Sequence, residues 1–303
     1  MKHSKIAIIG AGFVGSTTAY ALLLKNIAAE IILVDVNEVR CRGEILDLSD
    51  ALSFDGTSKI KLGNAQDAAQ ADIIIIAAGK AQEPNQKRSE LLAANKLIFD
   101  AIFTAIKPIN PKAIIIIVTN PLDLMTYHAQ LLSGLARNQV FGTGTFLDTL
   151  RLRGIIAEKT GVTCESVSAY MLGEHGDSQF AAWSSAQIAG IPITDYPGMT
   201  RENLNVIVDA VKNKAYEIIA CKGSTYFGIA TCVARICEAI VFDQKLVVPL
   251  SSYNEEYGIC LSMPVILGEN GIKRILQIPL DNNEQKQLAN CCKIIKDILF
   301  MIK

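Results

Sequence analysis

Two unbroken apolar runs constrain the fold of this chain more than any other feature. Ile73 to Ala77 and Ile114 to Val118 contain no polar residue, so they lack the alternation of a strand that has one face in water. Strands covered on both faces are typical of parallel sheets, in which helices form the crossovers. Both runs are far shorter than the roughly 20 apolar residues that cross a bilayer. We therefore expect buried strands and no membrane partner.

The first half of the chain alternates between such strand patterns and helical patterns. Strands are predicted at residues 6–9, 31–34, 73–77, 114–118 and 140–141. Helices are predicted between them at residues 15–25, 38–52, 88–106 and 121–132. This order predicts an α/β fold with a doubly wound parallel sheet.

The second half combines long helical patterns with short alternating ones, which is typical of an α+β domain. Helices are predicted at residues 145–160, 203–220, 224–242 and 283–302, and a strand at 167–172. Asn270-Gly271 lies between two further apolar runs and predicts a β-hairpin. The pattern changes near Gly142 to Thr145, so we expect domains at residues 1–143 and 144–303.

A glycine-rich turn follows the first predicted strand and precedes the first predicted helix. It consists of Gly10, Gly12 and Gly15, with Phe13 and Val14 between them. In a G-x-G-x-x-G turn the first glycine permits the tight bend, the second admits a pyrophosphate, and the third allows close helix packing. The free N–H groups at the helix N-terminus face the phosphates. This context predicts a Rossmann dinucleotide-binding domain.

Asp35 indicates which dinucleotide the turn binds. It follows the second predicted strand, where a carboxylate accepts hydrogen bonds from the adenine ribose hydroxyls. A 2′-phosphate at this position would meet a like charge, so NAD is favoured over NADP as the cofactor. A glycine turn without a ligand is the alternative.

Charge and cysteine content exclude several other classes of protein. Lys and Arg total 29 and Asp and Glu total 30, which gives a net charge of −1 and argues against nucleic-acid binding. No secretory leader is apparent, and eight scattered cysteines without zinc-site spacing are typical of buried thiols in a reducing compartment. We expect a cytoplasmic protein without a metal site. Adjacent Cys291 and Cys292 form the one pair that merits a redox test.

His175 is the strongest candidate for acid–base chemistry among the three histidines. It lies between two glycines in a turn after the predicted strand at 167–172, where a substrate has room to approach. Its pKa suits proton exchange near neutral pH. His128 is expected to be a surface or packing residue, and a structural role for His175 is the alternative.

Asp148 and Arg151 share a face of the predicted helix at 145–160. One interpretation is an ordinary ion pair within the helix. The other is that Asp148 orients a distant histidine and Arg151 offers its planar guanidinium group to a substrate carboxylate. Polar residues 79–88 leave the carboxyl end of a parallel strand, which is typical of a lid over a ligand, although a solvated loop has the same composition.

Four motifs together resemble those of the L-lactate/malate dehydrogenase family: the glycine turn with Asp35, the turn around His175, the Asp148–Arg151 pair and the polar residues 79–88. Further matches lie at residues 43–48, 119–123, 142–145 and 264–268, so the resemblance spans essentially the whole chain. It implies a Rossmann domain followed by an α+β substrate-binding domain, in a homodimer or homotetramer.

The resemblance also implies a role for each candidate residue. His175 exchanges a proton with the C2 oxygen of the substrate, and Asp148 stabilises its imidazolium. Arg151 binds the C1 carboxylate, and Arg88 polarises the carbonyl when the lid closes. Asn120 binds near the carbonyl and the cofactor, and the peptide bond that follows it is expected to be cis.

Two further positions point to pyruvate and L-lactate as substrates. Gln82 occupies the position at which malate dehydrogenases typically have an arginine for a second carboxylate, and a neutral amide would leave that carboxylate unpaired. Thr225 matches the residue that lines the methyl pocket of lactate enzymes. A malate enzyme, an enzyme for a larger 2-oxoacid, and a non-catalytic NAD-binding sensor are the alternatives.

Many bacterial members of the family bind fructose 1,6-bisphosphate through an arginine and a histidine. Arg153 matches the arginine, but Ser168 stands at the position of the histidine. We therefore expect weak or absent activation by this phosphate.

Overall fold

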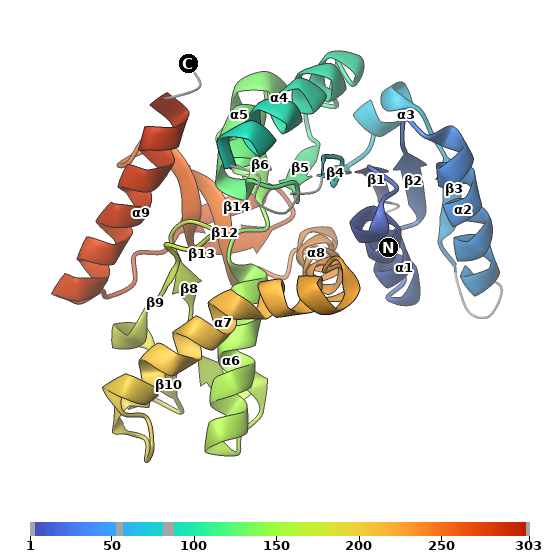
Figure 1. Cartoon of the computed structure of the whole chain (residues 1–303). Helices are drawn as coiled ribbons and strands as arrows, with labels where there is room; N and C mark the ends of the chain where they lie inside the picture. Colours follow the sequence, from blue (N-terminus) through green and yellow to red (C-terminus); the bar gives the residue numbers. More distant parts are fainter. Residues whose placement is uncertain (1–3, 53–56, 81–87, 301–303) are drawn as a thin grey trace.

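A single nine-stranded sheet forms the centre of the molecule (Figure 1). The computed structural model describes residues 4–52, 57–80 and 88–300, with the backbone alone at residues 88 and 89. Six strands run parallel in the order β3-β2-β1-β4-β5-β6, which is the order of a doubly wound dinucleotide-binding sheet. Their bounds are β1 Lys5–Ile9, β2 Glu30–Val34, β3 Lys59–Leu62, β4 Ile73–Ile76, β5 Ile114–Ile117 and β6 Val140–Gly142.

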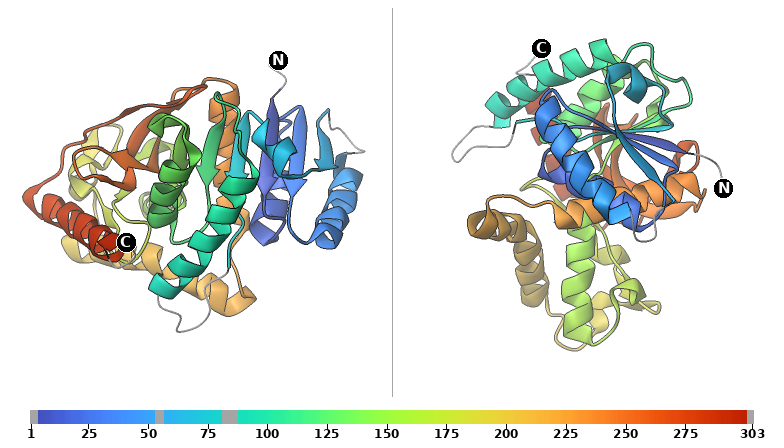
Figure 2. Two further views of the ribbon diagram at one scale, coloured as in Figure 1. Left: turned by 90° about the horizontal axis from the view of Figure 1, so that it is seen from above. Right: turned by 90° about the vertical axis from the view of Figure 1, so that its right-hand side faces the viewer.

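Helices cover both faces of the parallel strands (Figure 2). They are α1 Phe13–Leu24, α2 Glu38–Leu52, α3 Ala65–Ala69, α4 Arg88–Ala105 and α5 Leu122–Ser133. Successive isoleucines of β4 enter two different cores: Ile73 and Ile75 pack on one face of the sheet, and Ile74 on the other. The unbroken isoleucine runs therefore reflect strands buried on both sides, as predicted.

Three antiparallel strands from the second half extend the same sheet beyond β6. They are β12 Leu246–Asn254, β13 Ile259–Gly268 and β14 Gly271–Ile275, and β12 joins β6 where Ser251 pairs with Gly142. The hairpin predicted from Asn270-Gly271 is present, because Gly268 pairs with Gly271. The sequence did not predict β12 or the continuity of the sheet.

The remaining helices are α6 Phe146–Thr160, α7 Arg201–Lys222, α8 Phe227–Val241 and α9 Asn282–Phe300, and the short strands are β7 Val167–Ser168, β8 Met171–Leu172, β9 Phe180–Ala181, β10 Gln187–Ile188 and β11 Ile191–Pro192. Residues of α6, α7 and the strands β7 to β10 form a separate apolar core. Helices α8 and α9 instead pack into the two cores of the main sheet. Single 3₁₀ turns cover Arg137–Gln139, Cys164–Ser166, Trp183–Ser185 and Ile193–Asp195. Helix α8 crosses back to pack beside α1 (Figures 1 and 2).

Several predicted elements need correction. The single strand expected at residues 167–172 is wrong, because β7 and β8 pair in two different sheets. The first helix begins at Phe13 rather than Gly15. The helix predicted at residues 224–242 begins at Phe227. Two cysteines, Cys164 and Cys221, are exposed, whereas the other six are buried.

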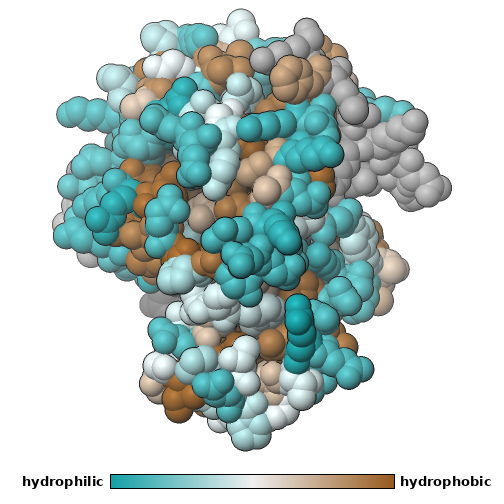
Figure 3. Space-filling model, turned by 90° about the vertical axis from the view of Figure 1, so that its left-hand side faces the viewer, coloured by the Kyte–Doolittle hydropathy of each residue, from teal (hydrophilic) through white to brown (hydrophobic). Residues whose placement is uncertain are grey.

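The surface carries mostly hydrophilic side chains on the face that bears α9, with apolar side chains in small groups between them (Figure 3). Among the described residues, no helix has the length and apolar character needed to cross a membrane.

All eight cysteines are free thiols.

Candidate active site

The glycine turn leaves one stretch of backbone open to a ligand. Gly10 has φ +108°, and a Cβ there would lie 2.6 Å from the backbone nitrogen of Ala78. A Cβ on Gly15 would lie 1.8 Å from the carbonyl oxygen of Gly10, whereas one on Gly12 would meet no atom within 4 Å. Gly10 and Gly15 thus serve close packing, and Gly12 leaves free space at the N-terminus of α1. A dinucleotide pyrophosphate fits this cradle.

Asp35 follows β2 and faces the same turn. One carboxylate oxygen accepts a hydrogen bond from the N–H of Ala11 at 2.6 Å, and the other from the N–H of Asn37 at 2.8 Å. Each oxygen retains a lone pair for a ribose hydroxyl. Beside it, the ring of Phe13 is 60% exposed and stacks on Tyr226 with 5.4 Å between ring centres. Val14 is half-buried.

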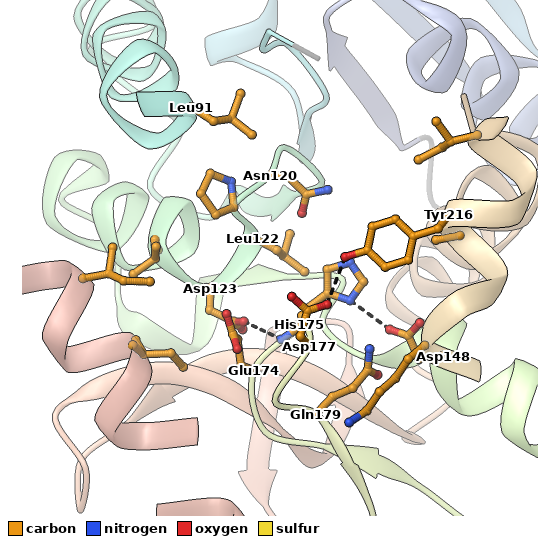
Figure 4. Close-up of a pocket in the computed structure, with 18 of the residues that line it drawn as sticks. Leu91, Asn120, Leu122, Asp123, Asp148, Glu174, His175, Asp177, Gln179 and Tyr216 are labelled. Carbon is orange, nitrogen blue, oxygen red and sulfur yellow. Dashed lines mark hydrogen bonds and ion pairs between the residues drawn. The ribbon is translucent and has the colours of Figure 1, made fainter. Parts of the chain in front are cut away.

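His175 and Asp148 form a direct pair across two elements. His175 lies in the turn after β8, and its Nδ1 is 2.8 Å from Oδ2 of Asp148 on α6 (Figure 4). Asp148 is buried, whereas 29% of the His175 side chain remains exposed. Among the described residues, none hydrogen-bonds the Nε2 atom of His175, which leaves that atom for a ligand.

Arg151 completes this group on the same helix. Its Nη1 donates to Oδ1 of Asp148 at 3.1 Å. The carboxylate therefore contacts both cationic groups at once, one through each oxygen. The two interpretations of the Asp148–Arg151 spacing are thus compatible: the ion pair within the helix is present, and Asp148 also reaches the distant histidine.

The electrostatics of the pair favour a protonated histidine. Burial opposes a charge on the imidazole, but the carboxylate of Asp148 more than offsets this effect, so the pKa of His175 is raised. Burial likewise opposes a charge on Asp148, but His175 and Arg151 hold the pKa of its carboxyl below the usual value. Such a pair can hold and release a proton at Nε2 while the carboxylate stays ionised.

A cavity of about 170 Å³ opens beside this pair. Asn120, Asp148, Arg151 and His175 all contribute to its wall. The α7 side is formed by Lys212, Ala215, Tyr216 and Ile219. Thr225 is not among the lining residues and lies half-buried between α7 and α8. These α7 residues could not be predicted, because their spacing resembles that of any half-exposed helix.

Two buried side chains that we did not predict organise the cavity from behind. Asn95 on α4 is fully buried; its Nδ2 donates to the carbonyl oxygen of Asn120 at 2.7 Å, and its Oδ1 accepts from the N–H of Lys80 at 2.8 Å. The Asn120–Pro121 peptide bond is cis. Asn95 therefore joins the backbone of Asn120 to that of Lys80, at the start of the polar residues 79–88.

Asp123 is the second of these buried side chains. Its Oδ2 accepts a hydrogen bond from the backbone N–H of His175 at 2.7 Å, and its Oδ1 accepts one from the hydroxyl of Ser251 at 2.6 Å. Burial, only partly offset by these hydrogen bonds, raises the pKa of Asp123 to about 6. The motif at 119–123 contained this residue, but its place at the start of a helix gave no sign of a distant partner.

Some predicted residues cannot be placed against the cavity. Gln82 lies outside the described residues, as does the side chain of Arg88, whose backbone begins α4. His128 pairs through Nε2 with Oδ1 of Asp100 at 2.7 Å, which fits its expected packing role.

The predicted phosphate-site positions lie away from this cavity. Arg153 donates from Nε to the carbonyl oxygen of Ala169 at 2.9 Å, and its guanidinium carbon lies 5.0 Å from the ring centre of Tyr170. Ser168 ends β7. Within the described part of the chain, no group of three or more His, Cys, Asp or Glu side chains could hold a metal ion.

Comparisons with known proteins agree along the full length of the chain. The family model of the lactate/malate dehydrogenase NAD binding domain matches residues 4–142, and that of the lactate/malate dehydrogenase alpha/beta C-terminal domain matches residues 145–302. The L-lactate dehydrogenase A of Rhizopus oryzae is 44% identical over 98% of this chain and 92% of its own length. The L-lactate dehydrogenase of Acetivibrio thermocellus is 42% identical over 97% and 96%.

A solved structure shows the same similarity in three dimensions. The minor L-lactate dehydrogenase from Enterococcus mundtii, in its ligands-bound form, matches with a TM-score of 0.95 and 36% sequence identity. The match covers 100% of this chain and 99% of that structure.

Proposed function

The chain belongs to the lactate/malate dehydrogenase family, and from this premise we propose that it is an NAD-dependent L-lactate dehydrogenase. NAD is its cofactor, in keeping with the matched NAD-binding domain and the open backbone at Gly12. The proposal rests above all on one observation, the convergence of His175, Asp148 and Arg151 on a single small cavity.

His175 is the acid–base group in this proposal. Its raised pKa keeps Nε2 protonated for reduction, and Asp148 holds Nδ1 and so directs Nε2 toward the cavity. As the carbonyl of pyruvate is reduced, Nε2 gives its proton to the oxygen that becomes the hydroxyl of lactate. The same nitrogen takes that proton back during oxidation.

Arg151 binds the carboxylate of the substrate through its planar guanidinium group. Asp148 holds that group in place through its Nη1 atom. Asn120 hydrogen-bonds near the carbonyl and the cofactor, and Arg88 polarises the carbonyl. Thr225 does not line the cavity, and its place beside the substrate methyl group is proposed from the family resemblance alone. When bound, NADH supplies the hydride that C2 of pyruvate accepts.

The cofactor is held by the turn after β1 and by Asp35. Gly10, Gly12 and Gly15 shape the backbone around the pyrophosphate, Phe13 and Val14 begin the helix whose N-terminus faces it, and Asp35 binds the adenine ribose.

Asp35→Ser should remove the carboxylate that repels a 2′-phosphate. The ratio of kcat/KM for NADPH to that for NADH should rise, and Asp47→Ser on the exposed side of α2 should leave it unchanged.

Gln82 is the residue that determines the preference for pyruvate over oxaloacetate in this proposal. A neutral amide offers no counter-charge to a second carboxylate, which disfavours oxaloacetate. Steady-state rates with a panel of 2-oxoacids test the proposal: the highest kcat/KM is expected with pyruvate. A higher kcat/KM with oxaloacetate, or with a larger 2-oxoacid, would replace it with the corresponding alternative, and no oxidation of NADH with any of them would favour a sensor.

We further propose a cytoplasmic homodimer or homotetramer with domains at residues 1–143 and 144–303. The matched ranges of the two family models support this division, and eight free thiols suit a reducing compartment. Light scattering after size-exclusion chromatography measures the assembly, and a monomeric mass would contradict it.

A further inference from the structure

We propose that Asp123 is a positioning residue that holds the peptide group of His175 and so keeps its imidazole aligned with Asp148. This inference rests on the proposed acid–base function of His175. It adds a second carboxylate to the site, one that reaches the histidine through the backbone rather than through the ring (Figure 4).

Asp123 connects three elements at one buried point. It is the second residue of α5, and only 3% of it is exposed. Its two oxygens accept from the N–H of His175 in the turn after β8 and from the hydroxyl of Ser251 in β12. The same stretch of chain, three residues earlier, carries Asn120. The carboxylate therefore fixes the distance between the histidine turn and the segment that bears Asn120.

The backbone hydrogen bonds of the turn lie on either side of the N–H of His175, and this N–H is held by Asp123 instead: Gly176 donates to the carbonyl oxygen of Glu174 at 2.9 Å. Gly173 exchanges two backbone hydrogen bonds with Ser262 of β13, at 3.0 and 2.8 Å. Two residues later, the N–H of His175 points to Asp123 at 2.7 Å. With the peptide held by Asp123 and Nδ1 held by Asp148, the direction of Nε2 is set from both ends of the residue.

The negative charge on Asp123 also stabilises the protonated form of His175. Glu174 of the same turn, the thiol of Cys260 on β13 and the thiol of Cys291 on α9 also interact electrostatically with it. Burial raises the pKa of both thiols, which keeps them uncharged near neutral pH, so His175 is the cation with which Asp123 interacts. The negative charge at Asp123 thus supports the imidazolium, in addition to Asp148.

Two substitutions separate hydrogen bonding from charge. Asp123→Asn retains an oxygen that can accept from His175 and an amide that can donate to Ser251, but it removes the charge. Asp123→Ala removes both. Asp100→Asn is the matched control, because Asp100 pairs with His128 rather than His175. Each variant is assayed with pyruvate, with NADH binding measured separately, and the histidine imidazoles are titrated by NMR in the holoenzyme with NADH.

For Asp123→Ala we expect a loss of about 100-fold in kcat with NADH affinity unchanged. For Asp123→Asn we expect kcat within about tenfold of the parent protein, and a titration midpoint of His175 lower by about half a pH unit or more. In the control, the midpoint of His175 and the activity stay constant. A merely structural role would lower stability without moving the midpoint of His175.

Two results would overturn the proposal: parental kcat in Asp123→Ala, or an unmoved His175 midpoint in Asp123→Asn. If the alanine variant does not fold, the asparagine variant decides alone. Failure of the proposed function is distinct from either result, because the parent protein would then not reduce pyruvate, whereas the NMR titration still reports whether Asp123 acts on His175.

Discussion

The carboxylate of Asp148 lies 2.8 Å from the Nδ1 atom of His175, although the two residues come from different elements of the fold. The other oxygen of the carboxylate receives Arg151. One buried anion thus holds both His175 and Arg151, so its loss should disturb proton transfer and substrate binding together.

Asp148→Asn should therefore change the pH dependence of catalysis. Without the carboxylate, burial of the imidazole is no longer offset, and the pKa of His175 falls. Pyruvate reduction needs the protonated ring, which exists only below that pKa, so the alkaline limb of kcat/KM moves to lower pH. At neutral pH we expect a loss of about 100-fold or more. Glu158→Gln, exposed on the same helix, is the control, and an unshifted limb would contradict the assignment.

His175→Ala should remove most turnover while the protein still binds NADH. Loss of the proton donor should lower kcat about 1000-fold, measured by the decrease in NADH absorbance with pyruvate. Fluorescence titration of NADH checks the cofactor site. His128→Ala removes the histidine that pairs with Asp100 and should retain activity. Near-parental turnover in His175→Ala would mean that another group donates the proton.

Gly12→Ala and Gly15→Ala should separate cofactor binding from stability. A methyl group at Gly12 meets no protein atom within 4 Å, so the melting temperature should stay within about 2 °C while NADH affinity falls about tenfold. A methyl group at Gly15 would collide with the carbonyl oxygen of Gly10 and should destabilise the fold by about 1–3 kcal/mol. Calorimetry and NADH titration test both. Unimpaired NADH binding by Gly12→Ala would argue against the pyrophosphate cradle.

Gln82→Arg should shift substrate preference toward oxaloacetate. The new guanidinium would pair with the second carboxylate, and the ratio of kcat/KM for oxaloacetate to that for pyruvate should rise about 100-fold. Gln86→Arg places the same charge four residues further along the polar segment and is the control. An unchanged ratio in Gln82→Arg would show that the chain discriminates between the two acids elsewhere.

Fructose 1,6-bisphosphate should have little effect on the parent protein. Arg153 is already engaged with the carbonyl oxygen of Ala169, and Ser168 supplies no cation. We expect kcat/KM for pyruvate to change less than about twofold on adding the phosphate, because half of the cationic set is absent. Ser168→His should increase the response, and strong activation of the parent protein would point to a different phosphate site.

Local sequence patterns predicted the parts of the fold that local forces determine. The isoleucine runs predicted β4 and β5, the glycine spacing predicted the turn before α1, and Asn270-Gly271 predicted the last hairpin. The strand at residues 167–172 was wrong because its two ends pair with different partners, which no local pattern records.

The residues of the candidate site likewise fall into those that local sequence patterns predict and those that only the assembled fold reveals. His175, Asp148 and Arg151 could be singled out because their chemistry is unusual in a turn or on one helix face. Asn95 and Asp123 could not, because a polar residue in a helix normally indicates a solvated surface or a favourable N-terminal charge. Their importance comes from burial and distant partners, which depend on the assembled fold.

The pairing of β12 with β6 also limits how the molecule can move. Strands from the two sequence halves belong to one sheet, joined where Ser251 pairs with Gly142, so β12 cannot move away from β6 without breaking that sheet. We therefore expect this sheet to stay intact when the cavity admits a ligand, so that any opening occurs in elements outside it.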